Sequence, residues 1–288
     1  MKIAPTWLAG LVAAASLSLN TFAASVSAPS TQWNSLAGNY DYLADQQTGQ
    51  ASGDIVGVGT NSGFFTTFNN NGSASATDGT LGFRLRLDEP GGNKQSPVFD
   101  RVAWIGLDAN ADAVLDAFIG LGMQGSSSVL GIFAPGSSAN TSPSTTSIAS
   151  AASFSYTINS ANYNFRPVDY TTDGGTTNDS TVTTEGDADY YLSILVPFGD
   201  LVSYLGTKGI NINDQTALRY VLATSTQHNS LNQDLGGVQG GINSTSTWTQ
   251  LGGFSLPMTA SGTVVPEPSG CLLGAAGLLL LGIRRRRA

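Results

Sequence analysis

Short hydrophobic segments rich in β-branched and aromatic residues recur along the middle of the chain, and clusters of Gly, Asn, Asp and Ser separate them. This pattern is typical of strands joined by turns, whereas long helical periodicity is hard to find. We expect strands at residues 54–59, 64–68, 81–87, 101–107, 114–121, 129–133, 154–158, 190–196, 218–223 and 247–251. Their spacing, without an internal repeat, predicts an all-β fold, a β-sandwich or jelly roll, rather than a solenoid.

Two segments depart from the strand pattern. Residues 198–205 follow Pro197 and precede Gly206, which are signals that begin and end a helix, so we expect one helix there. Residues 125–153 are rich in Ser, Thr and Ala and contain two prolines. This composition indicates a flexible insertion or a poorly structured loop within one domain.

The first residues have the pattern of a secretory signal peptide. Lys2 provides a positive start, residues 3–19 are mostly apolar or small, and small residues stand at Thr21 and Ala23. Signal peptidase reads small residues at these two positions, so the pattern predicts a signal peptide over residues 1–23, cut after Ala23. A buried N-terminal helix is the alternative, and Asn20 argues against it.

The C-terminal end has three parts. Residues 259–264 form a short linker, and the sequence Val265, Pro266, Glu267, Pro268 follows it. An apolar run at residues 271–283 comes next, shorter than the roughly 20 residues that usually span a bilayer, and it ends at a basic cluster of Arg284, Arg285, Arg286 and Arg287. Snorkelling arginines bring the run near the lower limit for a single transmembrane helix, and clustered arginines stay on the cytoplasmic side. The rest of the protein is then expected on the opposite side of the membrane from the cytoplasm.

This tail resembles the PEP-CTERM sorting signal of Gram-negative bacteria that produce exopolysaccharide. In that family a transpeptidase-like membrane enzyme, exosortase, cuts near the Pro-Glu-Pro motif and releases or transfers the body to the cell surface. The resemblance implies that exosortase recognises Pro266, Glu267 and Pro268, that residues 271–283 anchor the chain transiently in the inner membrane, and that the four arginines are the stop signal. The body, residues 24–258, also resembles those of other exported PEP-CTERM proteins of uncharacterised activity. A plain C-terminal anchor is the other interpretation.

Charge and residue usage narrow the function of the body. Of the 12 basic and 20 acidic residues in the chain, five basic residues and Glu267 lie in the two ends, so the body carries a net charge of −12. Nucleic acid and anionic lipid are therefore disfavoured as partners, because both bind positive surfaces. Cys271, the one cysteine, lies in the tail, and His228 is the one histidine. The body consequently has no disulfide, cysteine nucleophile, thiolate zinc site or multi-histidine metal site.

One acidic segment has the spacing of a calcium loop. Side-chain oxygens recur at Asp108, Asn110, Asp112 and Asp116, which are positions 1, 3, 5 and 9, and the carbonyl of Val114 falls at position 7. Calcium prefers six to eight oxygen ligands, and a tight turn directs alternate side chains inward. The segment is not an EF-hand, because position 6 is Ala113 instead of Gly, position 12 is Ile119 instead of Glu, and the flanks are expected strands. The alternative is an Asx-stabilised hairpin turn with solvated carboxylates.

Three further groups of residues are weaker candidates. The acidic residues Asp173, Asp179, Glu185, Asp187 and Asp189 lack ligand spacing, which favours a solvated loop over a metal site. A Ser/His/Asp triad would depend on His228, and no G-x-S-x-G motif occurs. Aromatic residues could form a sugar-stacking platform, although core packing is the more common role of strand aromatics. These aromatic residues are Trp33, Tyr40, Tyr42, Trp104, Tyr163, Tyr190, Tyr191 and Trp248.

Residues 190–201 resemble the strand-Pro-Phe-x-x-Leu step of family-9-like carbohydrate-binding sandwiches, which favours the predicted fold more than any ligand. The sequence as a whole favours an exported, exosortase-processed component of the cell surface or of an exopolysaccharide or biofilm matrix, without a catalytic role and with calcium as a possible ligand. Two alternatives stay open: a carbohydrate-binding module for extracellular polysaccharide, and a secreted hydrolase.

Overall fold

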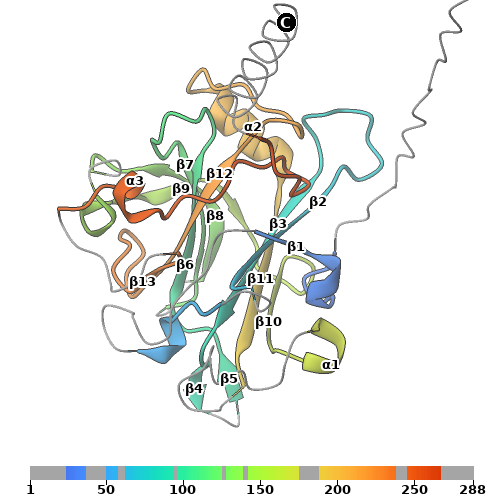
Figure 1. The fold of residues 1–288 in the computed structure, drawn as a ribbon, viewed down its shortest axis with the longest axis vertical. Helices are drawn as coiled ribbons and strands as arrows, with labels where there is room; N and C mark the ends of the chain where they lie inside the picture. The colour runs from blue at the N-terminus through green and yellow to red at the C-terminus, as the bar shows by residue number, and fades with distance from the viewer. Residues whose placement is uncertain are drawn as a thin grey trace, which may run out of the picture.

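The computed structural model describes residues 24–36, 50–57, 62–93, 96–124, 128–138, 142–174, 188–237 and 245–266. Both predicted targeting segments, residues 1–23 and nearly all of 265–288, lie outside this part of the chain. The all-β class is confirmed: two antiparallel sheets make up most of the described structure, with three short helices beside them (Figure 1). No helix among the described residues is long and apolar enough to span a bilayer.

Two large sheets and one small ribbon contain all the described strands. The five-stranded sheet has the order β1 (Asn34–Ser35), β2 (Phe64–Asn69), β3 (Thr80–Leu87), β11 (Tyr190–Pro197) and β10 (Tyr163–Pro167). The six-stranded sheet has the order β13 (Asp234–Leu235), β12 (Arg219–Ser225), β6 (Val102–Asp108), β7 (Ala117–Gly122), β8 (Val129–Pro135) and β9 (Ile148–Tyr156). The ribbon pairs β4 (Gly91–Asn93) with β5 (Ser96–Val98).

Alternation along the strands explains how the two sheets share one core. Every second side chain of a strand points to the same face, and on β3 the buried inward residues are Leu81, Phe83, Leu85 and Leu87. On the opposing sheet Ile105 of β6 faces the same interior. Helix α2 (Phe198–Gly206) lies at the upper end of the sheets in Figure 1 and contributes Phe198, Leu201, Tyr204 and Leu205 to this core.

The outward faces of both sheets are also covered. On the six-stranded sheet, Trp104 and Phe133 pack in a second apolar cluster with Trp248 of α3 (Trp248–Leu251). On the five-stranded sheet, Phe65 and Tyr191 pack with residues from the start of the described chain. Figure 1 shows α3 on the left of the two sheets and α1 (Tyr170–Asp173) on the right. The central strands are therefore buried on both faces, which explains near-continuous burial along β3 and β6.

The prediction of a flexible insertion or poorly structured loop over residues 125–153 is wrong for most of this segment, whereas the strand expected within it at residues 129–133 is confirmed. The segment contains β8 and most of β9. Leu130 and Ile132 of β8 are fully buried in the core between the sheets. Strand β9 lies at the edge of its sheet, so its Ser- and Ala-rich composition reflects exposure to solvent instead of missing structure.

The strand predicted at residues 247–251 is a helical turn instead. The side chain of Thr247 accepts a hydrogen bond from the amide of Gln250 (3.3 Å), and the Gln250 side chain accepts one from the amide of Thr247 (3.0 Å). This reciprocal capping box begins α3 and positions Trp248 in the outer cluster.

Three other boundaries differ from the sequence-based expectation. The strand expected at 114–121 begins only at Ala117, because the preceding residues belong to a structured turn. Of residues 54–59, Ile55 forms an isolated bridge with Leu87. The expected linker, residues 259–264, is a tight turn that packs on the body: the amide of Thr259 donates to the carbonyl of Thr263 (2.9 Å).

Candidate calcium site

The loop from Asp108 to Asp116 connects β6 and β7. Leu107 and Ala117 are the last paired residues of the hairpin, and the amide of Asp116 donates to the carbonyl of Leu107 at 2.7 Å. This bond closes the loop at its base, so the two aspartates stand opposite each other where the strands separate. Asp108 is fully buried, and Asp116 is 7% exposed.

Backbone amides converge on the carboxylate of Asp108. Oδ1 accepts hydrogen bonds from the amides of Asn110 (3.3 Å) and Ala111 (2.8 Å), and Oδ2 accepts one from the amide of Ala113 (3.1 Å). A buried polar group needs hydrogen-bond partners, and backbone amides supply them to Asp108. These three bonds fold the loop around Asp108.

The other polar side chains of the loop repeat the same motif. Oδ1 of Asn110 accepts from the amide of Asp112 (3.1 Å), and Oδ1 of Asp112 accepts from the amide of Val114 (2.9 Å). Across the base, Oδ2 of Asp116 accepts from the amide of Ala109 (2.8 Å). Each carboxylate keeps lone pairs that these bonds do not use, because a carboxylate has about four acceptor positions.

Two alanines of the loop have left-handed backbone conformations. The φ angles of Ala111 and Ala113 are 63° and 64°. This conformation is uncommon for residues with a Cβ atom and costs roughly 1–2 kcal/mol each. Ala113 stands at position 6 of the calcium-loop pattern, where EF-hands place glycine for a sharp turn. The loop therefore makes that turn with alanine in place of glycine.

Electrostatics at Asp116 are unfavourable for the charged carboxylate. Burial raises the pKa of Asp116, and the negative charges of Asp112 and Asp108 raise it further, although the hydrogen bond from the Ala109 amide opposes them. A bound cation would remove this repulsion. No cluster of three or more His, Cys, Asp or Glu side chains with metal-binding geometry occurs among the described residues. The three aspartates of the predicted site thus share one loop without forming such a cluster.

The second acidic group is not a solvated loop where the structure describes it. Asp173 and Asp189 are buried, and they pair with Arg166 and Arg86 respectively. The spacing of the acidic residues could not reveal these pairs, because the arginines lie outside the acidic segment, on strands of the five-stranded sheet. The other three members of the group, Asp179, Glu185 and Asp187, lie outside the described residues.

Four of the six candidate sugar-stacking aromatics that the structure describes are buried. Trp33, Trp104, Tyr191 and Trp248 are at most 5% exposed, so their faces are not available to a saccharide. Tyr163 and Tyr190 are half-buried, and Tyr40 and Tyr42 lie outside the described residues. Trp104 and Tyr191, which lie on strands, therefore have the core-packing role that is common for strand aromatics.

His228 contacts the six-stranded sheet. Its Nε2 atom lies 3.3 Å from the carbonyl oxygen of Gln124, and its ring occupies the space above Gly122. A Cβ atom added to Gly122 would lie 2.2 Å from the imidazole ring, so the glycine permits this close approach.

The structure describes only Val265 and Pro266 of the predicted sorting motif. The amide of Val265 donates to the carbonyl of Pro257 at 2.8 Å, and Pro266 is exposed. Glu267, Pro268 and the four arginines at 284–287 lie outside the described residues. No family model, curated protein or solved structure matches the chain.

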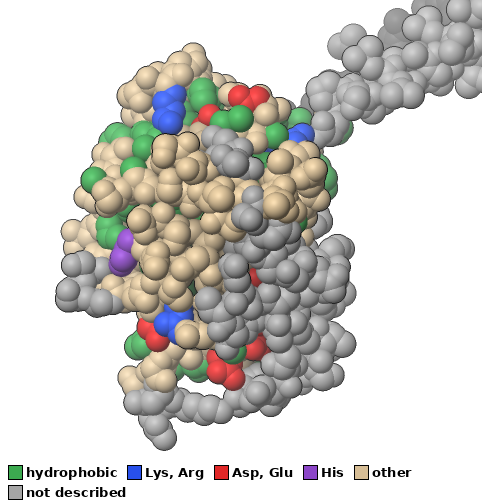
Figure 2. Space-filling view, turned by 90° about the vertical axis from the view of Figure 1, so that its left-hand side faces the viewer, with side chains coloured by type: hydrophobic (Ala, Val, Ile, Leu, Met, Phe, Trp, Pro, Cys, Tyr) green, Lys and Arg blue, Asp and Glu red, His purple; other side chains and the backbone are tan. Residues whose placement is uncertain are grey.

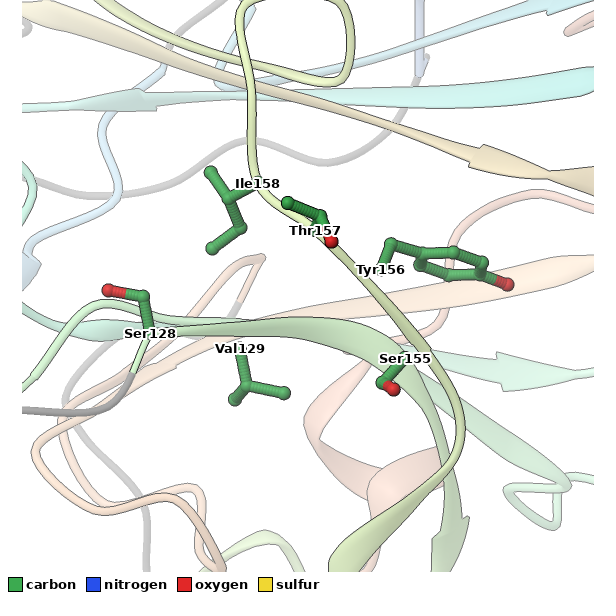
Figure 3. Close-up of a pocket in the computed structure, with 6 residues that line it drawn as sticks. All are labelled: Ser128, Val129, Ser155, Tyr156, Thr157 and Ile158. Atoms are coloured by element: carbon green, nitrogen blue, oxygen red, sulfur yellow. The ribbon is translucent and has the colours of Figure 1, made fainter.

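A solvent-open groove lies where β8 and β9 separate (Figure 3). It has a volume of about 550 Å³ and is lined by Ser128, Val129, Ser155, Tyr156, Thr157 and Ile158. Hydroxyl groups and two aliphatic side chains form its walls, and none of the lining side chains is charged. The hydroxyl of Tyr156 donates to Oδ2 of Asp200 (2.9 Å), which fixes the position of the ring.

Proposed function

We propose that this chain is an exported, exosortase-sorted protein of the bacterial cell surface or exopolysaccharide matrix, with a non-catalytic β-sandwich body that calcium stiffens. The tripartite tail carries this proposal. A Pro-Glu-Pro motif, a short apolar run and four arginines stand in the order that the PEP-CTERM resemblance requires. The exposure of Pro266 supports the proposal, because an enzyme that recognises the motif must reach this residue.

The composition of the body supports an extracellular role. It is acidic, it has no cysteine and it is rich in Ser and Thr, so it suits a soluble component of a hydrated matrix. Calcium enters the proposal through the Asp108–Asp116 loop. That loop combines alternating oxygen side chains, a left-handed turn at Ala113 and a buried carboxylate, Asp116, without a basic hydrogen-bonding partner. Extracellular calcium modules function with dissociation constants of about 10⁻⁴–10⁻³ M, so high affinity is not required.

Intact mass measurement of the extracellular protein tests the sorting proposal. The expected species begins at Ala24, after signal peptidase has removed residues 1–23, and lacks Arg284–Arg287. A strain without exosortase should retain the full tail in its membrane fraction. Glu267→Gln should impair release, whereas Glu89→Gln, a matched change in the body, should not. An extracellular form that still contains the four arginines, or a folded cytosolic body, contradicts the proposal.

The second candidate, a carbohydrate-binding module, is favoured by the groove at the end of β9. Its uncharged, hydroxyl-rich lining and its volume of about 550 Å³ suit a neutral saccharide, since small-molecule sites span roughly 300–1,000 Å³. Affinity electrophoresis in gels that contain the host's own polysaccharide discriminates the two functions. A binding module should be retarded, and Ser155→Arg should abolish this retardation. Ser203→Arg on α2 adds the same charge away from the groove and therefore corrects for the effect of charge on mobility. A passive matrix component should migrate equally in gels with and without polysaccharide.

A further inference from the structure

Four strands form the edges of the two large sheets, and three of them are protected against pairing with another chain. Strands β1 and β13 are two residues long. Strand β10 carries a charged residue and a proline at Arg166 and Pro167. Short length, charge and proline are the devices by which natural sheets avoid edge-to-edge association.

The fourth edge, β9, has none of these protections. It is nine residues long and contains neither a charged residue nor a proline. It pairs with β8 on one side. The amide of its first residue, Ile148, donates to the carbonyl of Asn229 (3.1 Å), and no described strand pairs with the other side of residues 149–156. Side chains at Ser150, Ser153 and Ser155 are exposed. An edge of this kind presents a row of backbone donors and acceptors to a partner strand.

The strands on the same side of the molecule also contain no charged side chains. From Ala117 to Phe165 the chain contains no Asp, Glu, Lys, Arg or His, although the body as a whole carries a net charge of −12. This stretch includes all of β7, β8 and β9. Figure 2, which views the left-hand side of Figure 1, shows a broad area of uncharged polar side chains and backbone with charged groups mainly toward its upper and lower ends.

A second copy of this chain is the partner that these observations fit. At physiological ionic strength, exposed charges interact over about 8 Å, so repulsion between two acidic copies depends on the charges near their contact. A contact at β9 brings together two strands that contain no charged residue, and the carboxylate of Asp200, which lies at one end of β9, accepts a hydrogen bond from the hydroxyl of Tyr156 (2.9 Å). An antiparallel strand pair about a two-fold axis is self-complementary, which is the usual symmetry of homodimers.

We propose that β9 pairs with β9 of a second copy, so that two six-stranded sheets join into one continuous sheet. The register of β9 against β8 shifts near Ala152 and again toward Ile148, which leaves residues 154–156 as the regular part of the edge. Pairing is therefore centred on this regular part, with Ser153 and Ser155 near the two-fold axis. The proposal does not depend on export or on calcium.

Cysteine cross-linking in the full chain tests this pairing. In a Cys271→Ser background, Ser155→Cys places the one thiol beside the proposed axis, and Ser203→Cys places it on the exposed side of α2 as a matched control. Paired strands bring opposed side chains within about 5 Å. With a short bis-maleimide, Ser155→Cys should form covalent dimers roughly a hundredfold faster than Ser203→Cys, because docking raises the local concentration from micromolar to millimolar. Higher salt should increase the difference, since it screens repulsion between the acidic bodies. Equal rates for the two variants overturn the proposal.

A charge-insertion variant supplies an independent measurement. Ser153→Lys combined with Ser155→Lys places four like charges across the proposed interface. The full-length variant in mild detergent should be monomeric by light scattering while the parent protein is dimeric, and both should melt at the same temperature when diluted. A parent protein that is monomeric at high concentration and high salt, or a variant that remains dimeric, contradicts the pairing.

Discussion

Arg166 and Asp173 are joined by two hydrogen bonds of 2.7 Å, one from each terminal nitrogen of the guanidinium to a different carboxylate oxygen. The side chain of Asp173 is fully buried, whereas that of Arg166 is 19% exposed. The carboxylate also accepts the amide of Ser30 (2.7 Å), which is far away in the sequence. One ion pair thus fixes the start of the described chain to the outer face of the five-stranded sheet.

Asp173→Asn should lower the free energy of unfolding by about 3 kcal/mol, because it leaves a partly buried guanidinium without its counter-charge. Urea denaturation at neutral pH measures this change. Asp169→Asn is the matched control: Asp169 caps α1 through the amide of Thr171 (3.0 Å), and asparagine caps helices equally well. A loss of the same size in both variants would show that the ion pair has no special role.

The pH dependence of the same variant follows from the pKa of Asp173. Burial alone would raise this pKa, but hydrogen bonds from Arg166, Ser30 and Asp169 outweigh burial and hold it below its usual value. Since the folded pKa is depressed, the stabilisation is present above the ordinary aspartate pKa and is lost as pH falls through the folded value. The difference between the parent protein and Asp173→Asn should therefore stay constant from neutral pH down to pH of about 4 and shrink as the pH falls further.

Arg84 holds the same N-terminal segment through backbone carbonyls. Its guanidinium donates to the carbonyls of Val26 (3.0 Å) and Ala28 (2.7 Å) and lies 4.3 Å from the ring centroid of Trp33. Burial, followed by the positive charge of Arg166, lowers the pKa of Arg84 to about 10, so the group remains charged at neutral pH.

Arg84→Lys should keep the charge but lose the planar donor fork and the stacking on Trp33. We expect residues 24–33 to detach more often, with at least tenfold faster amide exchange, which corresponds to about 1.4 kcal/mol. Hydrogen exchange followed by mass spectrometry measures this locally. Arg101→Lys, a change at a partly exposed position whose Nη1 lies 3.2 Å from Asp100, should leave exchange in that segment unchanged. If amide exchange in residues 24–33 is the same in both variants, the apolar contacts of this segment hold it in place, not Arg84.

Gly120 on β7 allows Trp104 of β6 to cover the outer face of the sheet. A Cβ atom added to Gly120 would lie 2.0 Å from the indole ring. Gly120→Ala should therefore destabilise the protein by about 1–3 kcal/mol, the usual cost of overpacking. Gly206→Ala on α2 has no atom within 4 Å of the added methyl group and should be neutral or slightly stabilising. Thermal unfolding of the two variants measures the contrast, and a similar loss in both would exclude contact with Trp104 as its cause.

The strands that the sequence predicted well are those with buried residues at every second position. Strand β3 combines Leu81, Phe83 and Leu85 on one face, and its predicted bounds differ by one residue from the observed ones. Its other face contains Arg84, whose partners lie more than fifty residues earlier in the chain. Local pattern cannot reveal such a pairing, because it depends on which segment folds over the sheet.

The errors in the prediction have identifiable physical causes. Composition suggested disorder around β9, because the side chains that an edge strand exposes to water are small and polar. The helical turn α3 was predicted as a strand, although Thr247 and Gln250 have the spacing of a capping box and could have indicated a helix start. For the Asp108 loop, the alternating oxygens were apparent in the sequence, but the left-handed turns at Ala111 and Ala113 were not.

Asp116 provides the sharpest test of calcium binding, because its carboxylate is buried and close to two other negative charges. Its pKa is raised by burial and then by Asp112 and Asp108. Asp116→Asn can keep the hydrogen bond from the Ala109 amide through its side-chain oxygen, so without calcium the variant should be as stable as the parent or more stable. With 10 mM calcium, roughly 10–100 times the expected dissociation constant, the parent should gain about 1–3 kcal/mol and the variant should gain little.

Acidification should abolish the calcium effect in a defined direction. Because the folded pKa of Asp116 is raised, protonation stabilises the folded state, and the calcium-free protein gains this stability as pH falls through that pKa. A proton on Asp116 then neutralises the charge that a bound cation would otherwise neutralise. The calcium-dependent gain in stability should therefore disappear over the same pH range. Asp78→Asn is the matched control: Asp78 lies in another hairpin loop and accepts the amide of Gly79 (2.7 Å), yet the variant should retain the full response. If the parent protein gains no stability from calcium, or Asp116→Asn gains as much as the parent, the loop is an Asx-stabilised turn and calcium has no part in stabilising the body.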